Sequence, residues 1–327
     1  MRRRDFISLL GGAAAWPLAA RAQQAAKPTV GFLSGLAPDL FADRVREFRE
    51  GLNEMGYTEG RNVRIEYRWA EGQNNRFPAL AADLVRSGVS IIFAAGSTLA
   101  ASAAKAATTT IPIVFSIGSD PIESGLVTSL NRPGGNITGV TNLNLELSAK
   151  RLELLHEVVP AAASVALLVN QTNLPLAEVD VRNVQRVATA LGLRLHVLNA
   201  SSENEFESTF KSLIKQDIRA LVIGADVFFT SWRNRLGALS ALHAIPTAYQ
   251  TREFAAAGGL LSYSGISLEA YRLGGVYCGR ILKGERVGEL PVQQSTKVEL
   301  VINLKTAKAI GIEFPTSLLL RADEVIE

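Results

Sequence analysis

Apolar and polar positions follow two alternating patterns along most of the chain. The apolar run 29–35 predicts a strand, and Phe41, Val45, Phe48 and Leu52 then recur at the spacing of one helix face. The same strand-then-helix pattern repeats through the first half. It predicts strands at 63–67, 90–95, 111–117 and 137–143, with helices at 76–86 and 99–107.

A second series of the same kind begins after the turn-forming residues 131–136. We expect helices at 149–159, 176–191, 203–215, 231–243, 268–283 and 305–310, and strands at 165–170, 194–199, 220–225, 246–249, 259–263 and 297–302. Strands that alternate with helices pair in parallel, and the helices cover both faces of the sheet. The predicted fold class is therefore α/β, with two doubly wound parallel-sheet lobes. Since no long linker separates them, we expect several short crossings that form a hinge around a central cleft.

Ligands of such sheets bind outside the carboxyl ends of the strands, so the loops that follow predicted strands are the candidate site. The candidate ligand-binding residues in these loops are Ser34, Gly35, Ser97, Thr98, Ser119, Asp120, Asn170, Asp226, Tyr249 and Tyr263.

Two kinds of polar residue in this set could bind the opposite charged ends of a solute. Ser97 and Thr98 precede a helix, where hydroxyls and backbone N–H groups either cap the helix or hold a carboxylate at its positive end. Asp120 and Asp226 follow apolar strands, and a ligand ammonium group would offset the desolvation of either carboxylate in a closed cleft. The competing interpretation is local: Asp120 starts a turn before Pro121, and Asp226 caps the next helix.

Aromatic side chains occur in the same loops. Phe228, Tyr249 and Tyr263 offer flat apolar surface for a ring-bearing or apolar solute, with Tyr263 placed to cover its body. Ordinary packing beneath the loops is the alternative explanation for each.

Composition and charge narrow the classes of protein. The chain has 327 residues, of which 47% are hydrophobic and 20% charged, which is typical of a folded protein with two domains. Four of its 34 basic residues, Arg2, Arg3, Arg4 and Arg21, precede position 23, and without them and Asp5 the basic and acidic residues balance. Binding to nucleic acid therefore has no electrostatic basis.

The first 22 residues have the layout of an export signal. A basic start is followed by an apolar stretch, broken by Pro17, and by the small-residue ending Ala20-Arg21-Ala22. The pair Arg3-Arg4 resembles a twin-arginine signal. We expect segment 1–22 to be cleaved and the mature protein to be free in the periplasm, because no cysteine follows for a lipid anchor and the apolar run is shorter than the roughly 20 residues that span a bilayer.

Signatures of catalysis and of cofactor binding are missing from the sequence. The nucleotide-binding motif G-x-x-x-x-G-K-[ST] does not occur, and no G-x-G-x-x-G opens the first helix. No G-x-S-x-G string occurs either, and His156, His196 and His243 stand far apart. Cys278 is the single cysteine and lies on the apolar face of a predicted helix, so it forms no intramolecular disulfide. We expect no catalytic residue, no metal, no cofactor and no enzyme activity.

Six stretches are specific enough to suggest a family. They are GSDP at 118–121, RPGGNITGV at 132–140, GGLLSY at 258–263, RILKG at 280–284, LPVQQ at 290–294 and NLKTAK at 303–308. In these stretches the chain resembles the solute-binding proteins of ABC-type transporters, in the subfamily that includes tryptophan- and other aromatic-amino-acid-binding members. One departure is Ser264, which stands where many relatives have glycine.

The resemblance implies a type I periplasmic-binding fold. Its lobes would be 28–143 plus 266–290, and 144–265 plus 291–327. They would close on a small molecule, such as an aromatic or branched amino acid or a related carboxylate, and a monomer would then deliver it to a membrane permease. Two other functions stay open: a periplasmic sensor that signals to a membrane receptor, and an exported hydrolase or isomerase.

Overall fold

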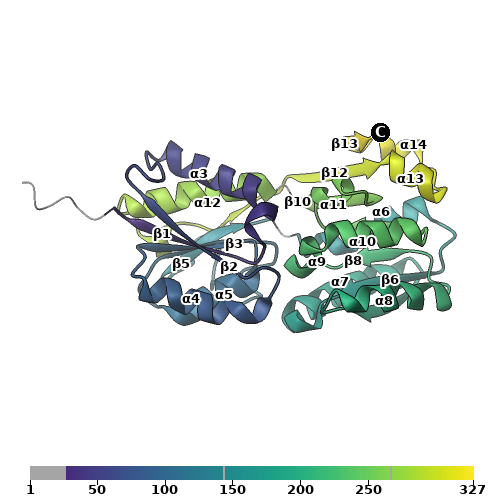
Figure 1. The fold of residues 1–327 in the computed structure, drawn as a ribbon, viewed down its shortest axis with the longest axis horizontal. Helices are drawn as coiled ribbons and strands as arrows, with labels where there is room; N and C mark the ends of the chain where they lie inside the picture. Colours follow the sequence, from purple (N-terminus) through teal and green to yellow (C-terminus); the bar gives the residue numbers. More distant parts are fainter. Residues whose placement is uncertain (1–26, 143, 266) are drawn as a thin grey trace, which may run out of the picture.

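The computed structural model describes residues 27–142, 144–265 and 267–327. It has two lobes that lie side by side, and each is a mainly parallel sheet with helices on both faces (Figure 1). The predicted α/β fold with two parallel-sheet lobes is confirmed. The proposed export signal at 1–22 lies outside the described residues. In the part of the chain that the structure describes, no helix is long and apolar enough to cross a membrane.

The first lobe is built on six parallel strands in the order β11-β5-β4-β3-β1-β2. The strands are β1 Thr29–Ser34, β2 Arg64–Trp69, β3 Ile91–Ala95, β4 Ile113–Ile117, β5 Ile137–Thr141 and β11 Gln293–Gln294. The helices are α3 Ala42–Glu54, α4 Phe77–Arg86, α5 Thr98–Ala107 and α12 Ser267–Leu282, with short 3-10 turns at Pro38–Leu40, Asn74–Arg76 and Val287–Glu289.

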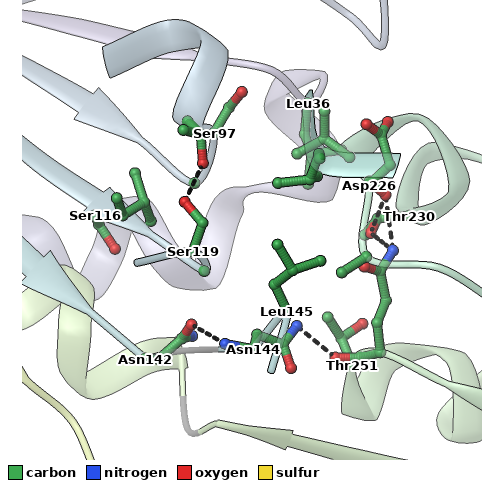
Figure 2. Close-up of a pocket in the computed structure, with 18 of the residues that line it drawn as sticks. Leu36, Ser97, Ser116, Ser119, Asn142, Asn144, Leu145, Asp226, Thr230 and Thr251 are labelled. Atoms are coloured by element: carbon green, nitrogen blue, oxygen red, sulfur yellow. Dashed lines mark hydrogen bonds between the residues drawn. The ribbon is translucent and has the colours of Figure 1, made fainter. Parts of the chain in front are cut away.

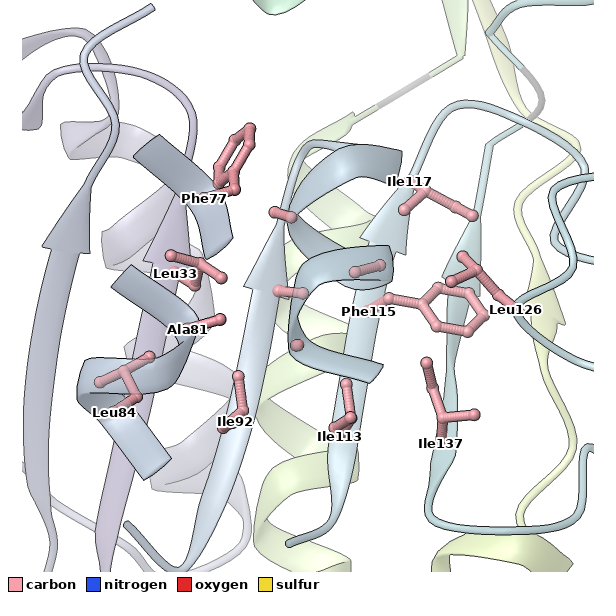
Figure 3. Packing of buried hydrophobic residues seen from close by; sticks show 14 of the residues in the cluster. Leu33, Phe77, Ala81, Leu84, Ile92, Ile113, Phe115, Ile117, Leu126 and Ile137 are labelled. Atoms are coloured by element: carbon pink, nitrogen blue, oxygen red, sulfur yellow. The ribbon is translucent and has the colours of Figure 1, made fainter. Parts of the chain in front are cut away.

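Apolar side chains fill both faces of this first sheet. One cluster joins Leu33, Ile92 and Phe115 of the strands to Phe77 and Leu84 of α4 (Figure 3). The other face packs against α3 and α12. Each buried aliphatic or aromatic side chain contributes roughly 1.5–3 kcal/mol relative to its exposed state, so a two-faced core holds the strand ends rigidly.

The second lobe has seven strands in the order β13-β12-β10-β9-β8-β6-β7. They are β6 Ser164–Val169, β7 Arg194–Asn199, β8 Leu221–Ile223, β9 Thr247–Tyr249, β10 Leu261–Gly265, β12 Val298–Asn303 and β13 Glu324–Ile326. The helices are α6 Leu147–Val158, α7 Leu174–Ala190, α8 Asn204–Lys215, α9 Val227–Ser231, α10 Arg233–Leu242, α11 Arg252–Ala256, α13 Leu304–Ile310 and α14 Thr316–Leu319, with a 3-10 turn at Gln171–Asn173.

One strand pair departs from the parallel arrangement. β10 leaves the second sheet toward the first lobe, whereas β12 enters it from the first lobe, so the two strands run antiparallel. The remaining pairs of this sheet are parallel.

The two sheets share one strand order. In the first lobe β2-β1-β3-β4-β5 are neighbours, and in the second lobe β7-β6-β8-β9-β10 follow the same sequence of crossovers. The carboxyl ends of equivalent strands therefore emerge at equivalent positions. In each lobe the order reverses beside its first strand, which is where ligands of such sheets bind.

The chain crosses between the lobes three times: after β5, after β10, and between β11 and β12. The lobe boundaries remain a proposal. Because Gln293–Gln294 pairs with β5 of the first sheet, we propose that the second segment of the first lobe ends at 294 instead of 290.

A buried arginine joins the crossing after β5 to the second sheet. Arg151 of α6 is fully buried, and its guanidinium donates to the backbone carbonyl oxygens of Asn144 and Tyr263, each at 2.8 Å, and to Oγ of Ser148 at 2.8 Å. Burial lowers the pKa of Arg151 to about 10. These hydrogen bonds attach the crossing after β5, at Asn144, to α6 and to strand β10 of the second lobe.

Candidate ligand-binding cleft

A cavity of about 110 Å³ lies between the lobes. Its walls come from the loops after β1, β3 and β4 of the first lobe, from the crossing after β5, and from the loops after β6, β8 and β9 of the second lobe. Figure 2 shows Ser119 on one side, Asp226 on the other, and Leu145 pointing into the space between them. The cleft is thus formed by equivalent strand ends of both sheets.

The first-lobe wall carries neutral hydroxyl groups. Ser97 is the N-cap of α5, and its Oγ accepts a hydrogen bond from the N–H of Ala100 at 3.4 Å. Oγ1 of Thr98 and Oγ of Ser119 are hydrogen-bonded at 2.8 Å. These groups lie at the positive end of a ten-residue helix, which suits an anionic group of a ligand.

Gly96 allows this wall to pack closely. Its φ of +76° is in the left-handed region, and a Cβ atom here would lie 2.5 Å from the hydroxyl oxygen of Tyr271. Tyr271 comes from α12, which touches α3 backbone to backbone where Gly51 and Gly275 leave room. This close approach places Tyr271 beside Arg44 of α3.

The second-lobe wall carries a buried carboxylate. Asp226 is 6% exposed; its Oδ1 accepts from the N–H of Phe228 at 2.8 Å and from Nδ2 of Asn170 at 3.1 Å, and its Oδ2 accepts from Nδ2 of Asn173 at 2.8 Å. Burial raises the pKa of Asp226, and these hydrogen bonds oppose the rise. These three donors are all neutral, so none of them offsets the charge of the carboxylate, whereas a cationic group of a ligand would.

The lobes touch around the rim of the cavity. Arg44 of the first lobe forms an ion pair with Glu253 of α11, and its guanidinium lies 5.4 Å from the ring centroid of Phe41. Although burial opposes it, Arg44 holds the pKa of Glu253 below its ordinary value. Farther along the rim, Arg182 and Glu123 pair at 2.9 Å.

Two further contacts complete the rim. Nδ2 of Asn144 donates to the carbonyl oxygen of Gln250 at 3.0 Å. Gly35 faces Val227 so closely that an added Cβ would lie 3.0 Å from its methyl group. Contacts at several points show that the lobes are in a closed arrangement.

Four of the ten predicted residues line the cleft together: Ser97, Thr98, Ser119 and Asp226. They come from both lobes and face the same cavity. Whether they touch a ligand stays a prediction.

Three predicted polar positions and one glycine lie beside the cleft but outside its lining. Ser34 is fully buried, with Oγ accepting from the N–H of Leu36 at 3.3 Å, and Gly35 belongs to the rim. Asp120 starts a turn, since its Oδ1 accepts from the N–H of Ile122 at 2.6 Å. Asn170 supports Asp226 instead of facing the cavity. We no longer propose these four as ligand contacts.

The two predicted tyrosines pack into the second lobe. Tyr249 is fully buried, stacks on Phe254 and shares a hydrogen bond with Oγ of Ser240 at 2.9 Å. Tyr263 packs against the apolar cluster of the sheet, and only its backbone oxygen has a partner near the hinge, Arg151. Neither lines the cleft, and both pack as the alternative explanation describes; a ligand contact of either tyrosine stays a prediction.

Several lining residues are not among the ten candidates, although the loop that holds Gln250 and Thr251 was one of the candidate loops. Gln250 and Thr251 directly follow Tyr249, and alternation along a strand could have indicated that they, rather than Tyr249, leave the core. Arg44 and Tyr271 lie on helices, where the rule about strand ends gives no signal.

Comparison with known proteins shows the family to which this chain belongs. Residues 32–326 match the family described as ABC transporter substrate binding protein. The chain belongs to this family. A tyrosine-binding protein of Clostridioides difficile is 28% identical over 269 residues, which are 81% of this chain and 76% of that protein. The family resemblance stated from the sequence is therefore confirmed.

Two solved structures are informative about this substrate-binding protein. An ABC domain of Streptococcus pneumonia in complex with L-Trp is 25% identical, covers 92% of this chain and 100% of its own, and has a TM-score of 0.83. The ligand-free, open structure of a Clostridium difficile substrate-binding protein with adhesive properties is 24% identical, covers 91% and 99%, and has a TM-score of 0.63. Both structures share the two-lobed fold of this chain.

Proposed function

We propose that the protein is the substrate-binding component of an ABC importer that captures a free α-amino acid between its lobes. The cleft offers a hydroxyl-bearing helix N-terminus on one wall and a buried carboxylate on the other. An α-amino acid carries both a carboxylate for the first wall and an ammonium group for the second, which is why we propose this ligand class.

The single observation that carries this proposal is the environment of Asp226. Its carboxylate is buried beside the cavity with three neutral hydrogen-bond donors. A buried charge without an opposite charge is costly, and a ligand ammonium would remove that cost. Amino-acid relatives such as the tyrosine-binding protein support the same ligand class.

Ligand binding would favour closure of the two lobes. The pair Arg44 and Glu253 joins the two lobes across the rim, so it forms only when the cleft is closed. A ligand that contacts both walls favours that state because its contacts with one wall are lost on opening.

A screen for thermal stabilisation tests the amino-acid proposal. A ligand at one hundred times its Kd adds about 2.7 kcal/mol to the free energy of unfolding. For the amino acid with the largest shift, we expect no comparable shift with the matching 2-hydroxy acid, which lacks the ammonium, or with the matching amine, which lacks the carboxylate. Equal shifts with either analogue would contradict the proposed pairing of walls and charges.

We further propose that the protein works in the periplasm as a monomer, after removal of residues 1–22, and passes its ligand to a membrane permease without chemical change. The family to which the chain belongs supports this role. Sequencing the N-terminus of protein recovered from the periplasmic fraction tests the export step, and a mature chain that still begins at Met1 would contradict it.

A further inference from the structure

We infer that Gln250 determines specificity: its amide oxygen accepts a hydrogen bond from the side chain of the ligand. The ligand is then an α-amino acid whose side chain carries a hydroxyl or an amide group. The inference rests on the proposed function and names the part of the ligand that this residue recognises.

Gln250 lies in the second-lobe wall of the cleft. It directly follows β9 and lines the cavity, although it is only 3% exposed. Its backbone carbonyl accepts a hydrogen bond from Nδ2 of Asn144 at 3.0 Å, so the crossing after β5 holds the backbone at this point. The residue is thus fixed at the carboxyl end of a strand, where ligands of such sheets bind.

The orientation of the Gln250 amide follows from its two partners. Nε2 donates to the backbone carbonyl oxygen of Asp226 at 2.7 Å and to Oγ1 of Thr230 at 3.0 Å. A backbone carbonyl can only accept a hydrogen bond, so the nitrogen of the amide must face it and the amide oxygen must face the other way. Thr230, which lies beside Asp226 (Figure 2), donates to the same carbonyl at 3.4 Å and is itself held in place.

The oxygen of this amide is left for a ligand. Among the described residues, Oε1 of Gln250 accepts no hydrogen bond, and it is not one of the polar atoms that they enclose without a partner. Because Gln250 is buried elsewhere and lines the cavity, we infer that Oε1 faces the cavity. In a closed cleft an amide oxygen without a donor is costly, and a donor on the ligand removes that cost.

The side chain is the part of an α-amino acid that can supply this donor. Under the proposed function, the ammonium pairs with the carboxylate of Asp226, which lies beside Asn170 and Asn173. Gln250 contacts the backbone carbonyl of Asp226 instead, so the carboxylate and Oε1 are separate acceptors of one wall. The ligand carboxylate only accepts hydrogen bonds and cannot pair with Oε1.

Calorimetric titration with pairs of amino acids of similar size tests the inference. The pairs are threonine and valine, glutamine and methionine, and tyrosine and phenylalanine, and only the first member of each carries a side-chain donor. In the pair that binds most tightly, we expect the first member to bind about tenfold more tightly, because the second leaves Oε1 of Gln250 without a donor. Equal or tighter binding of the second member in that pair would overturn the inference while leaving the proposed function intact.

The same titrations separate the inference from the proposed function. If other α-amino acids bind but none of these six does, the inference fails and the proposed function stands. If no α-amino acid binds, both fail.

Variants locate the preference in the amide. Gln250→Met keeps the length of the side chain and should bring the two affinities of the tightest pair to within about twofold of each other. A purely structural role of Gln250 would weaken both members alike and leave their ratio unchanged, which would overturn the inference. If this variant does not fold, Thr230→Val removes one of the two acceptors that orient the amide and should reduce the ratio about threefold; an unchanged ratio would again contradict the inference. Gln216→Met, at an exposed side chain outside the cavity lining, is the matched control and should keep the wild-type ratio.

Discussion

The two walls of the cleft are built at equivalent places but differ in charge. After β3 of the first lobe, Ser97 caps α5 with a neutral hydroxyl, and after the equivalent strand β8, Asp226 caps α9 with a carboxylate. Both side chains accept a hydrogen bond from the helix that follows, and both line the cavity. The same local arrangement, a helix cap directly after a strand, thus gives one neutral wall and one charged wall, and we propose that together they bind a dipolar ligand.

The largest expected effect concerns the charged wall. Asp226→Asn should weaken binding of the preferred amino acid about 100-fold, or about 3 kcal/mol, because the ligand ammonium loses its buried counter-charge. Calorimetric titration measures the change. Asp217→Asn, at an exposed side chain that pairs with Arg219, is the control and should bind as the wild type does. If Asp226→Asn bound the amino acid with an affinity within threefold of the wild type, the second wall would not act through its charge, and the proposed difference between the walls would be wrong.

The carboxyl group of Glu146 provides a contrast to that of Asp226. Both oxygens of Asp226 accept hydrogen bonds, whereas one oxygen of Glu146 has no partner among the described residues. Glu146 is half-buried at the start of α6, and its Oε2 has no hydrogen-bond partner among the described residues. Burial raises its pKa to about 7, and the carboxylates of Asp120 and Glu123 on the first lobe raise it further, while the backbone N–H groups of Glu146 and Asp120 lower it.

The sign of the pH effect follows from that raised pKa. The folded protein favours the protonated form of Glu146, so its contribution to stability is complete below about pH 4.5 and is lost as pH rises through about 7. At pH 8 we expect Glu146→Gln to be more stable than the wild type by about 1–2 kcal/mol, a figure reduced for partial exposure to solvent. Thermal unfolding at pH 4.5 and pH 8 measures it; a gap that does not widen with pH would contradict the assignment.

The smallest effect concerns the neutral wall. Ser97→Ala removes the cap of α5 and one hydroxyl of the cleft, which should reduce stability by about 1 kcal/mol and binding by about fivefold. Unfolding by denaturant and titration give the two numbers separately. Ser208→Ala, at an exposed serine in α8, is the control. If Ser97→Ala reduced affinity as much as Asp226→Asn, the two walls would contribute equally to binding, and the proposed difference between them would be wrong.

The sequence predicted the fold well because hydrophobic periodicity reports which face of each element is buried. It predicted one helix over 231–243, whereas the structure has α9 and α10, separated at Trp232. The cap at Asp226 starts α9 earlier than the apolar pattern indicated. The short strands β11 and β13 were missed, since two or three residues are too few to show alternation.

Prediction of the site was less complete for a physical reason. The rule that ligands lie beyond strand ends selects a loop but not the direction of each side chain within it. Ser119 lines the cleft while its neighbour Asp120 turns away to cap a turn, and Gln250 lines it while Tyr249 points into the core. Contributions from helices, such as Arg44, depend on packing between segments distant in sequence.

The buried arginine at the crossings also determines where the molecule can bend. Because Arg151 of α6 donates to the carbonyl of Asn144 in the crossing after β5 and to the carbonyl of Tyr263 in β10, the backbone at Asn144 is attached to the second lobe. We therefore expect a rotation between the lobes to leave Asn144 with the second lobe and to be taken up by the backbone nearer to β5.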